Sequence, residues 1–146
     1  MTRVLIVDDS LTDAYRAEQL SLDYFSEVMT VCTARGFFIE MDSFKPDLVL
    51  MDVMIGEVEN GFALISEWRS IEVERGLEKT PIAVVSSKTA PEDRDWAFKQ
   101  GAQAYLTKPI TRENLIEAIK FLLPLQSLEV SAKGIVVVPG KSSNLR

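Results

Sequence analysis

The stretch DLVLMDVM, residues 47–54, carries the clearest signal of the fold in this sequence. Its apolar run, Leu48–Met51, has the length and composition of a strand buried inside a sheet. The run ends abruptly on Asp52, so that a carboxylate stands where a buried strand stops. The stretch therefore predicts a core strand and raises the question of what its terminal acid does.

Four further apolar runs of strand length accompany this one along the chain. They are rich in branched side chains, and none alternates apolar with polar residues as a half-exposed strand does: Val4–Val7, Val28–Cys32, Ile82–Val85 and Ala104–Leu106. We therefore expect parallel strands that are covered on both faces. The single cysteine, Cys32, has no partner for a disulfide, and we expect it to be a small buried group in its strand.

Amphipathic segments with helical spacing separate these runs. Ser10-x-x-Asp13 and Thr89-x-x-Glu92 resemble capping boxes at helix starts, and Gly36 and Gly101 punctuate helical segments. The clearest apolar stripe lies near the end of the chain: Leu115, Ile116, Ile119, Leu122 and Leu123. Five βα units with right-handed crossovers predict an α/β fold, a doubly wound five-stranded parallel sheet of flavodoxin-like order 2-1-3-4-5 with helices on both faces.

The expected sheet brings polar residues to one edge. In such sheets ligands bind beyond the carboxyl ends of the strands, where the strand order reverses, here between the first and third strands. Asp8 and Asp9 end the first strand and Asp52 ends the third, while Ser86 and Lys108 end the fourth and fifth. The sequence therefore predicts a crevice that holds three acids, a hydroxyl and one cation.

The three acids require positive charge. Two unit charges ~4 Å apart repel by on the order of 4 kcal/mol at an effective dielectric constant of about 20. Lys108 alone cannot offset three anions, which favours a hard divalent cation with oxygen ligands, and Mg²⁺ suits carboxylates, waters and a phosphoryl group. A carboxylate beside Mg²⁺ and an ammonium is also a competent nucleophile toward phosphorus.

Composition excludes several other classes of function. The chain of 146 residues contains no histidine, which excludes histidine-based catalysis and imidazole zinc sites. Its net charge of −6 argues against nucleic acid as a direct partner. The opening apolar run is too short for a signal peptide or a membrane span of roughly 20 residues, so we expect a cytoplasmic protein without membrane insertion.

Four motifs stand at the expected strand ends, in order along the chain: VLIVDDS at 4–10, DLVLMDV at 47–53, PIAVVSS at 81–87 and GAQAYLTKP at 101–109. In this order they resemble the receiver domain of two-component response regulators, over roughly residues 2–125. The resemblance implies that Asp52 accepts a phosphoryl group from a phosphohistidine on a histidine kinase or phosphotransfer protein. It also implies that Asp9, Asp52 and the backbone carbonyl of Met54 bind Mg²⁺, while Asp8 helps through water.

The same resemblance assigns roles to the other residues at this edge of the sheet. Lys108 would pair with the aspartate and the phosphoryl oxygens, Ser86 would hydrogen-bond the phosphoryl group, and Tyr105 matches an aromatic switch position. A downstream protein target would bind about residues 91–126. Such a protein is a signalling phosphoacceptor and no ordinary enzyme, since it catalyses only its own phosphorylation and dephosphorylation.

One stretch resembles a particular subgroup of receivers, and one loop differs from the usual receiver pattern. The stretch from Ser86 to Pro109 is similar to single-domain receivers of chemotaxis-like and pilus-driven twitching pathways. The loop after the acceptor, MIGEVENG at 54–61, lacks the common proline and is about one residue longer than usual. Met54 and Lys88 occupy the two positions whose side chains often tune the lifetime of the phosphorylated state.

Two other functional classes share part of this pattern. A haloacid-dehalogenase-like phosphatase needs a second acid two residues after its nucleophile, but that place holds Met54. A non-phosphorylated pseudo-receiver that acts as a protein-binding adaptor is the closer alternative, although such proteins typically lose one of the acids or the lysine. Taken singly, the acids also have an ordinary interpretation, because Asp8 and Asp9 favour the dipole of the helix that follows.

The sequence divides into a receiver domain, residues 1–126, and a C-terminal tail, residues 127–146. The tail contains GIVVVP at 134–139, an apolar run with strand propensity. An exposed strand pairs readily with a sheet edge or another chain, so we expect this run to dock on the domain or to mediate homodimerisation. The tail is too short for a DNA-binding or catalytic domain, which predicts a stand-alone receiver.

Overall fold

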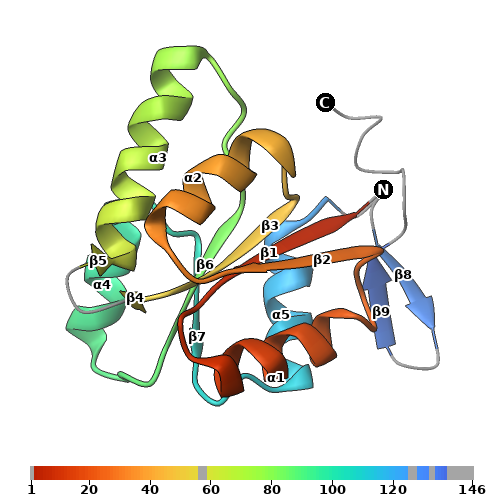
Figure 1. Ribbon diagram of the computed structural model, residues 1–146. Helices are drawn as coiled ribbons and strands as arrows, with labels where there is room; N and C mark the ends of the chain where they lie inside the picture. The colour runs from red at the N-terminus through yellow and green to blue at the C-terminus, as the bar shows by residue number, and fades with distance from the viewer. Residues whose placement is uncertain (1, 56–58, 125–127, 132–133, 138–146) are drawn as a thin grey trace.

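The computed structural model describes residues 2–55, 59–124, 128–131 and 134–137 (Figure 1). Its main sheet has five parallel strands in the order β2-β1-β3-β6-β7. Their bounds are β1 Arg3–Val7, β2 Glu27–Val31, β3 Leu48–Asp52, β6 Ile82–Ser86 and β7 Ala104–Thr107. Each predicted apolar run forms a strand, and the predicted order 2-1-3-4-5 is confirmed, because β4 and β5 form a separate short hairpin.

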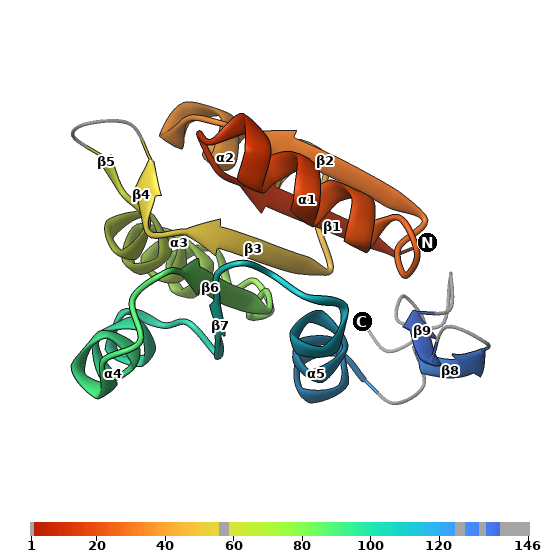
Figure 2. The ribbon, with the colours of Figure 1, turned by 90° about the horizontal axis from the view of Figure 1, so that it is seen from below.

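Helices cover both faces of this sheet (Figures 1 and 2). Helices α1 (Leu11–Ser21) and α5 (Arg112–Leu122) pack on one face. Helices α2 (Ala34–Ser43), α3 (Gly61–Arg75) and α4 (Pro91–Gln100) pack on the other.

The central strands contribute to both cores. Because successive side chains of a strand point to opposite faces, Val4 and Ile6 join the core under α1 and α5, while Leu5 and Val7 join the other core. Every residue of β3 is buried, as its unbroken apolar run predicts. The edge strand β2 is instead half-buried along its whole length.

The helix boundaries match the sequence only in part. Ser10 caps α1 by accepting a hydrogen bond from the Asp13 backbone N–H, and Gly101 ends α4 in the left-handed region, with φ of 111°. The predicted capping box at Thr89 is wrong, because Ala90 is the N-cap and makes no side-chain cap bond. Pro91 is the reason, since proline fixes φ at the first helical position and keeps the preceding residue extended.

Two more findings correct the sequence analysis. Cys32 is exposed and not buried in a strand, because β2 ends at Val31 and Cys32 lies just beyond it. Gly36 does not end a helix but lies in the first turn of α2. The long loop after β3 also forms a hairpin of β4 (Met54–Ile55) and β5 (Glu59–Asn60).

The predicted tail contains two strands. Strands β8 (Leu128–Ser131) and β9 (Gly134–Val137) pair antiparallel in a sheet of their own, and β9 contacts α5. The predicted strand propensity of the run at 134–139 is therefore realised over 134–137, while residues 138 and 139 lie outside the described residues. Docking of this segment on the domain, or dimerisation through it, stays a prediction.

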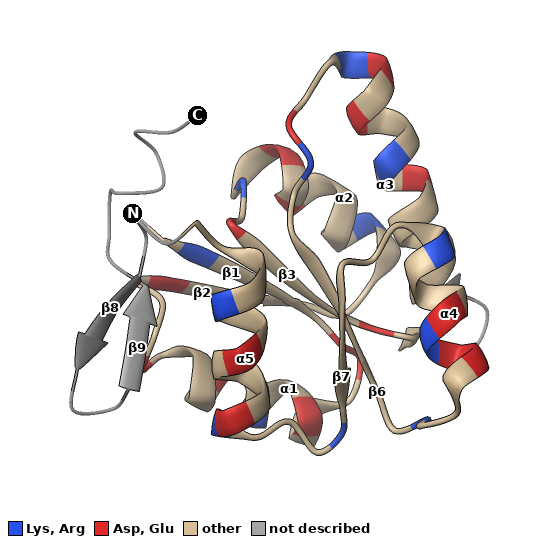
Figure 3. Cartoon of the chain, turned by 180° about the vertical axis from the view of Figure 1, so that it is seen from behind, with Lys and Arg blue, Asp and Glu red and all other residues tan. Residues whose placement is uncertain are grey.

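Charge is mixed over the helices. Helices α3, α4 and α5 each carry both basic and acidic residues (Figure 3). Within the part of the chain that the structure describes, no helix has the length and apolarity that a membrane crossing requires.

Candidate functional site

Three carboxylates meet at the carboxyl edge of the sheet. Val7 of β1 pairs with Met51 of β3, so the two strands end side by side and deliver Asp8 and Asp52 to the same crevice. One carboxylate oxygen from each of Asp8, Asp9 and Asp52 lies within 4.8 Å of the others. Asp8 and Asp52 are buried, while Asp9 is exposed, so the cluster opens to solvent on one side.

The local backbone fixes the first of these acids. Oδ1 of Asp8 accepts a hydrogen bond of 2.9 Å from the backbone N–H of Ser10, two residues on. The backbone N–H of Asp8 donates to the carbonyl of Val31 at the end of β2. The side chain is therefore held by the same turn that starts α1, which leaves Oδ2 to face the crevice.

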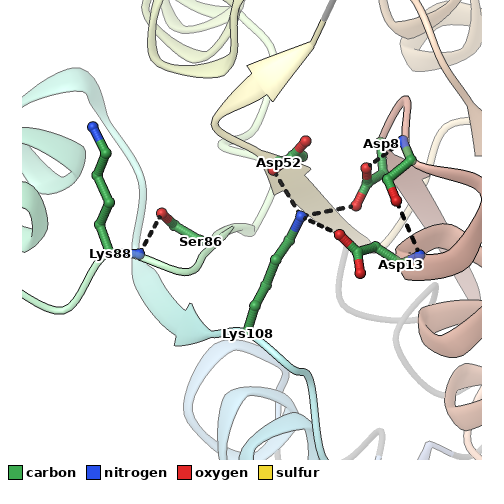
Figure 4. A network of polar contacts seen from close by, with 7 residues as sticks. Asp8, Asp13, Asp52, Ser86, Lys88 and Lys108 are labelled. Carbon is green, nitrogen blue, oxygen red and sulfur yellow. Dashed lines mark hydrogen bonds and ion pairs between the residues drawn. The ribbon is translucent and has the colours of Figure 1, made fainter.

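Lys108 reaches the acids from the far side of the crevice (Figure 4). Its backbone N–H donates to the Ser86 carbonyl, which fixes the start of the loop after β7. Its Nζ lies 3.1 Å from Oδ1 of Asp52, 3.4 Å from Oδ2 of Asp8 and 2.9 Å from Oδ2 of Asp13. One ammonium thus pairs with three carboxylates.

This arrangement shifts two pKa values. Burial raises the pKa of Asp52 from 3.8 to about 6, reinforced by the nearby Asp8 carboxylate and opposed by the hydrogen bond from Lys108. Burial disfavours the ammonium of Lys108, but hydrogen bonds to Asp13 and Asp52, together with the charges of Asp52 and Asp8, hold its pKa above the usual 10.5. Asp52 is therefore ionised and Lys108 protonated at neutral pH.

The donor atoms at the crevice fit a hard divalent cation. Asp8, Asp9 and Asp52 offer only carboxylate oxygens, which Mg²⁺ prefers, and the exposed position of Asp9 leaves one side open to the waters that Mg²⁺ retains. Among the residues that the structure describes, no cysteine or histidine joins these acids in the cluster.

The remaining predicted residues lie in or just after β3, β6 and β7. Ser86 is buried at the end of β6, and its Oγ accepts a hydrogen bond of 3.1 Å from the Lys88 backbone N–H (Figure 4). Met54, the first residue of β4, is 57% exposed. Lys88 is exposed, and its carbonyl accepts a hydrogen bond of 2.9 Å from the Tyr105 hydroxyl. The Tyr105 ring also lies 4.9 Å from the Arg94 guanidinium carbon.

Sequence reasoning missed one acid that pairs with Lys108. It assigned Asp13 to a helix cap, but the cap uses the backbone N–H of Asp13, while its carboxylate pairs with Lys108. The available signal was its spacing. An acid in the first turn of a helix that starts beside Asp8 and Asp9 stays close to the same sheet edge.

Comparisons with known proteins agree with this geometry. The sequence profile of the response regulator receiver domain matches residues 4–120. The protein PilH of Pseudomonas aeruginosa is 32% identical over 123 residues, which cover 84% of this chain and 98% of PilH. The protein PilG of the same organism is 27% identical over 84% of this chain and 87% of PilG.

A solved structure of a chemotaxis protein has the same fold. The structure of the Vibrio cholerae chemotaxis protein CheY4 superimposes with a TM-score of 0.73 at 26% identity, over 84% of this chain and 99% of that one. The family profile covers most of this chain, and the match to PilH covers almost the whole length of PilH. The chain therefore belongs to the response regulator receiver domain family.

Proposed function

We propose that this protein is the phosphoacceptor of a two-component phosphorelay. In this proposal, Asp52 takes a phosphoryl group from a phosphohistidine of a histidine kinase or phosphotransfer protein, and the acyl phosphate switches a protein-binding surface. The observation that carries the proposal is the meeting of three carboxylates and the Lys108 ammonium around one crevice.

Asp52 is suited to be the nucleophile. With a pKa of about 6, it is ionised at neutral pH yet buried enough to lack a full shell of water. One carboxylate oxygen would attack phosphorus while the bond from phosphorus to the imidazole nitrogen breaks. The electron pair of that bond leaves with the imidazole, and an acyl phosphate forms on Asp52.

The neighbouring residues would stabilise the charge of the transferred group. Asp8, Asp9 and Asp52, with the Met54 backbone carbonyl, would hold Mg²⁺, which when bound neutralises charge on the phosphoryl oxygens. Lys108 stands 3.1 Å from the acceptor and can donate to those oxygens. The Ser86 hydroxyl accepts from Lys88, which leaves its own hydrogen free to donate.

The proposed output surface spans about residues 91–126, that is α4, β7 and α5. A groove in this region is lined by residues that include Phe98, Tyr105 and Phe121. Trp96 and Phe121 are 51% and 75% exposed, which suits a surface that binds a protein. The hydrogen bond from Tyr105 to the Lys88 carbonyl connects this surface to the loop after Ser86, so a change at Ser86 can reach it.

The proposal also covers the division of the chain, the cellular location and the type of pathway. Residues 1–126 would be the receiver domain and 127–146 a tail. The protein would act in the cytoplasm, in a pathway of chemotaxis or twitching type, without binding nucleic acid directly. A pseudo-receiver adaptor that is never phosphorylated is the second candidate, but Asp8, Asp9, Asp52 and Lys108 are all present and in contact range.

Labelling by a small phosphodonor tests the proposal. Acetyl phosphate is added with and without MgCl₂, and intact mass is measured for wild type, Asp52→Asn and the control Asp42→Asn, which alters an exposed acid paired with Arg75. We expect wild type and Asp42→Asn to gain one phosphoryl group only with Mg²⁺, and Asp52→Asn to gain none. Equal labelling of Asp52→Asn would refute the acceptor, and no labelling of any protein would favour the adaptor.

A further inference from the structure

We propose that Asp13 is a positioning residue of this site, which holds the Lys108 ammonium in the unphosphorylated protein and releases it when Asp52 is phosphorylated. This inference rests on the proposed function and adds a regulatory element to it. Asp13 lies outside the group of acids that could share a metal ion, so its role concerns the lysine alone.

The ammonium of Lys108 is fully engaged in the present state. A lysine ammonium has three N–H donors, and here three carboxylates lie within 3.4 Å of Nζ. Asp13 makes the shortest of the three contacts, at 2.9 Å. A phosphoryl oxygen that arrives at Asp52 can therefore gain a bond from Lys108 only if an existing contact is given up.

Burial decides which contact is given up. The side chains of Asp8 and Asp52 are 7% and 9% exposed, whereas that of Asp13 is 44% exposed. A half-exposed carboxylate that loses its partner is solvated by water at little cost, while a buried one is left unsatisfied. Asp8 is also held by the Ser10 backbone N–H. Asp13 is thus the partner that Lys108 leaves most easily.

Helix α1 carries a second contact to the same loop. Nε of Arg16, one turn after Asp13, donates a hydrogen bond of 2.6 Å to the Ile110 carbonyl in the loop between β7 and α5. Asp13 and Arg16 therefore connect α1 to both Lys108 and Ile110. Release of Lys108 removes one of these two connections, so the contact between α1 and this loop becomes dependent on phosphorylation.

The substitution Asp13→Asn isolates this role. The amide has the shape of the carboxylate, and the helix cap survives because it uses the backbone N–H of Asp13. The variant no longer holds Lys108 by charge, so the ammonium is free to bind the oxygens of the phosphoryl group during transfer. We expect its maximal rate of phosphorylation to rise about three- to tenfold, as the loss of one nearby screened charge predicts, with little change in the donor concentration for half-maximal rate.

The experiment measures labelling rates against acetyl phosphate concentration at fixed MgCl₂ by intact mass. Asp13→Glu restores the charge, and Glu18→Gln removes a charge from the same helix, where that carboxylate accepts a hydrogen bond from Thr30 instead. We expect both to stay within about twofold of wild type, since neither releases Lys108.

The outcomes separate the two proposals. Equal or slower labelling of Asp13→Asn, or an equal rise in Glu18→Gln, would overturn the role of Asp13 while the acceptor role of Asp52 stands. A loss of thermal stability without a change in rate would make Asp13 merely structural and would overturn it too. If wild type itself is never labelled, the proposed function fails, and the role of Asp13 fails with it.

Discussion

Nζ of Lys108 lies 3.1 Å from Oδ1 of Asp52, although the two residues are 56 positions apart in the sequence. The parallel sheet explains the contact, because β3 and β7 flank β6 and all three strands end at the same edge. The two side chains are also buried enough that the pKa values of both are shifted. The free energy of unfolding therefore depends on the ionisation of this site.

The stability of the metal-free protein should depend on the ionisation of Asp52. Burial raises the pKa of this carboxyl from 3.8 to about 6, so the folded state keeps a proton that the unfolded chain has already lost. Between about pH 4 and pH 6 the folded state binds more protons, and the free energy of unfolding falls as the pH rises. Asp52→Asn removes this penalty, and we expect it to be more stable than wild type at pH 8 by on the order of 2 kcal/mol.

Thermal unfolding in a chelator from about pH 4 to pH 8 checks this expectation. The advantage of Asp52→Asn should fall to a small remainder near pH 4, where the wild-type carboxyl is protonated in the folded state and about half protonated in the unfolded chain, whose pKa is 3.8. A difference between the two proteins that is independent of pH would contradict the role of burial.

Magnesium should stabilise the folded protein through the same acids. A ligand present at about 100 times its dissociation constant adds about 2.7 kcal/mol, which corresponds to roughly 5–10 °C in Tm for a domain of this size. We expect Asp9→Ala to lose most of this rise, because Asp9 is the exposed member of the cluster and its removal disturbs the core little. Differential scanning calorimetry with and without MgCl₂ measures the effect. An equal rise in both proteins would place the metal elsewhere.

Glu72 should be a structural acid with no part in phosphorylation. It is 3% exposed and accepts hydrogen bonds from the Trp68 indole N–H, the Arg69 guanidinium and the Thr80 backbone N–H. Glu72→Gln replaces an acceptor with a donor in this buried group, and we expect a loss of about 2–3 kcal/mol in urea unfolding. The exposed Glu74→Gln on the same helix should cost almost nothing. Labelling by acetyl phosphate at a temperature where both fold should be normal, and a defect would contradict the assignment.

Gly61 should be required for a stable fold, because a side chain at this position would clash with the backbone of the acceptor, Asp52. A Cβ added there would lie 2.1 Å from the Asp52 carbonyl oxygen, so alanine must displace the end of β3. We expect Gly61→Ala to lose at least about 3 kcal/mol of stability and to be phosphorylated more slowly. Gly76→Ala is the control, since it has open space but a φ of 67°, and it should cost about 1–2 kcal/mol with normal labelling. Similar costs for the two variants would contradict the close approach at Gly61.

The sequence predicted the sheet well because its strands are covered on both faces. Continuous apolar runs such as Leu48–Met51 leave little choice of element, and the parallel order then brings Asp8 and Asp52 to one edge. Cys32 was expected inside the second strand, but that strand ends one residue earlier, at Val31. The end of a strand depends on its pairing with the neighbouring strand, and the identity of one residue does not determine that pairing.

The misses have two physical causes, helix packing and the position of a proline. The partners of Asp13 and Glu72 depend on how α1 and α3 are rotated against the sheet, and packing sets that rotation. From its spacing Asp13 was assigned to a helix cap, and Glu72 was assigned no role. The helix cap at Thr89 was misplaced because Pro91 moved the start of α4 by one residue.

Locating the phosphoryl group after labelling tests most directly whether Asp52 is the acceptor. After labelling with acetyl phosphate and MgCl₂, borohydride reduces an aspartyl phosphate to homoserine, and peptide mass spectrometry identifies the reduced residue. The account predicts homoserine at position 52 alone, with Asp8, Asp9 and Asp13 unchanged. Reduction at another acid, with Asp52 intact, would contradict it.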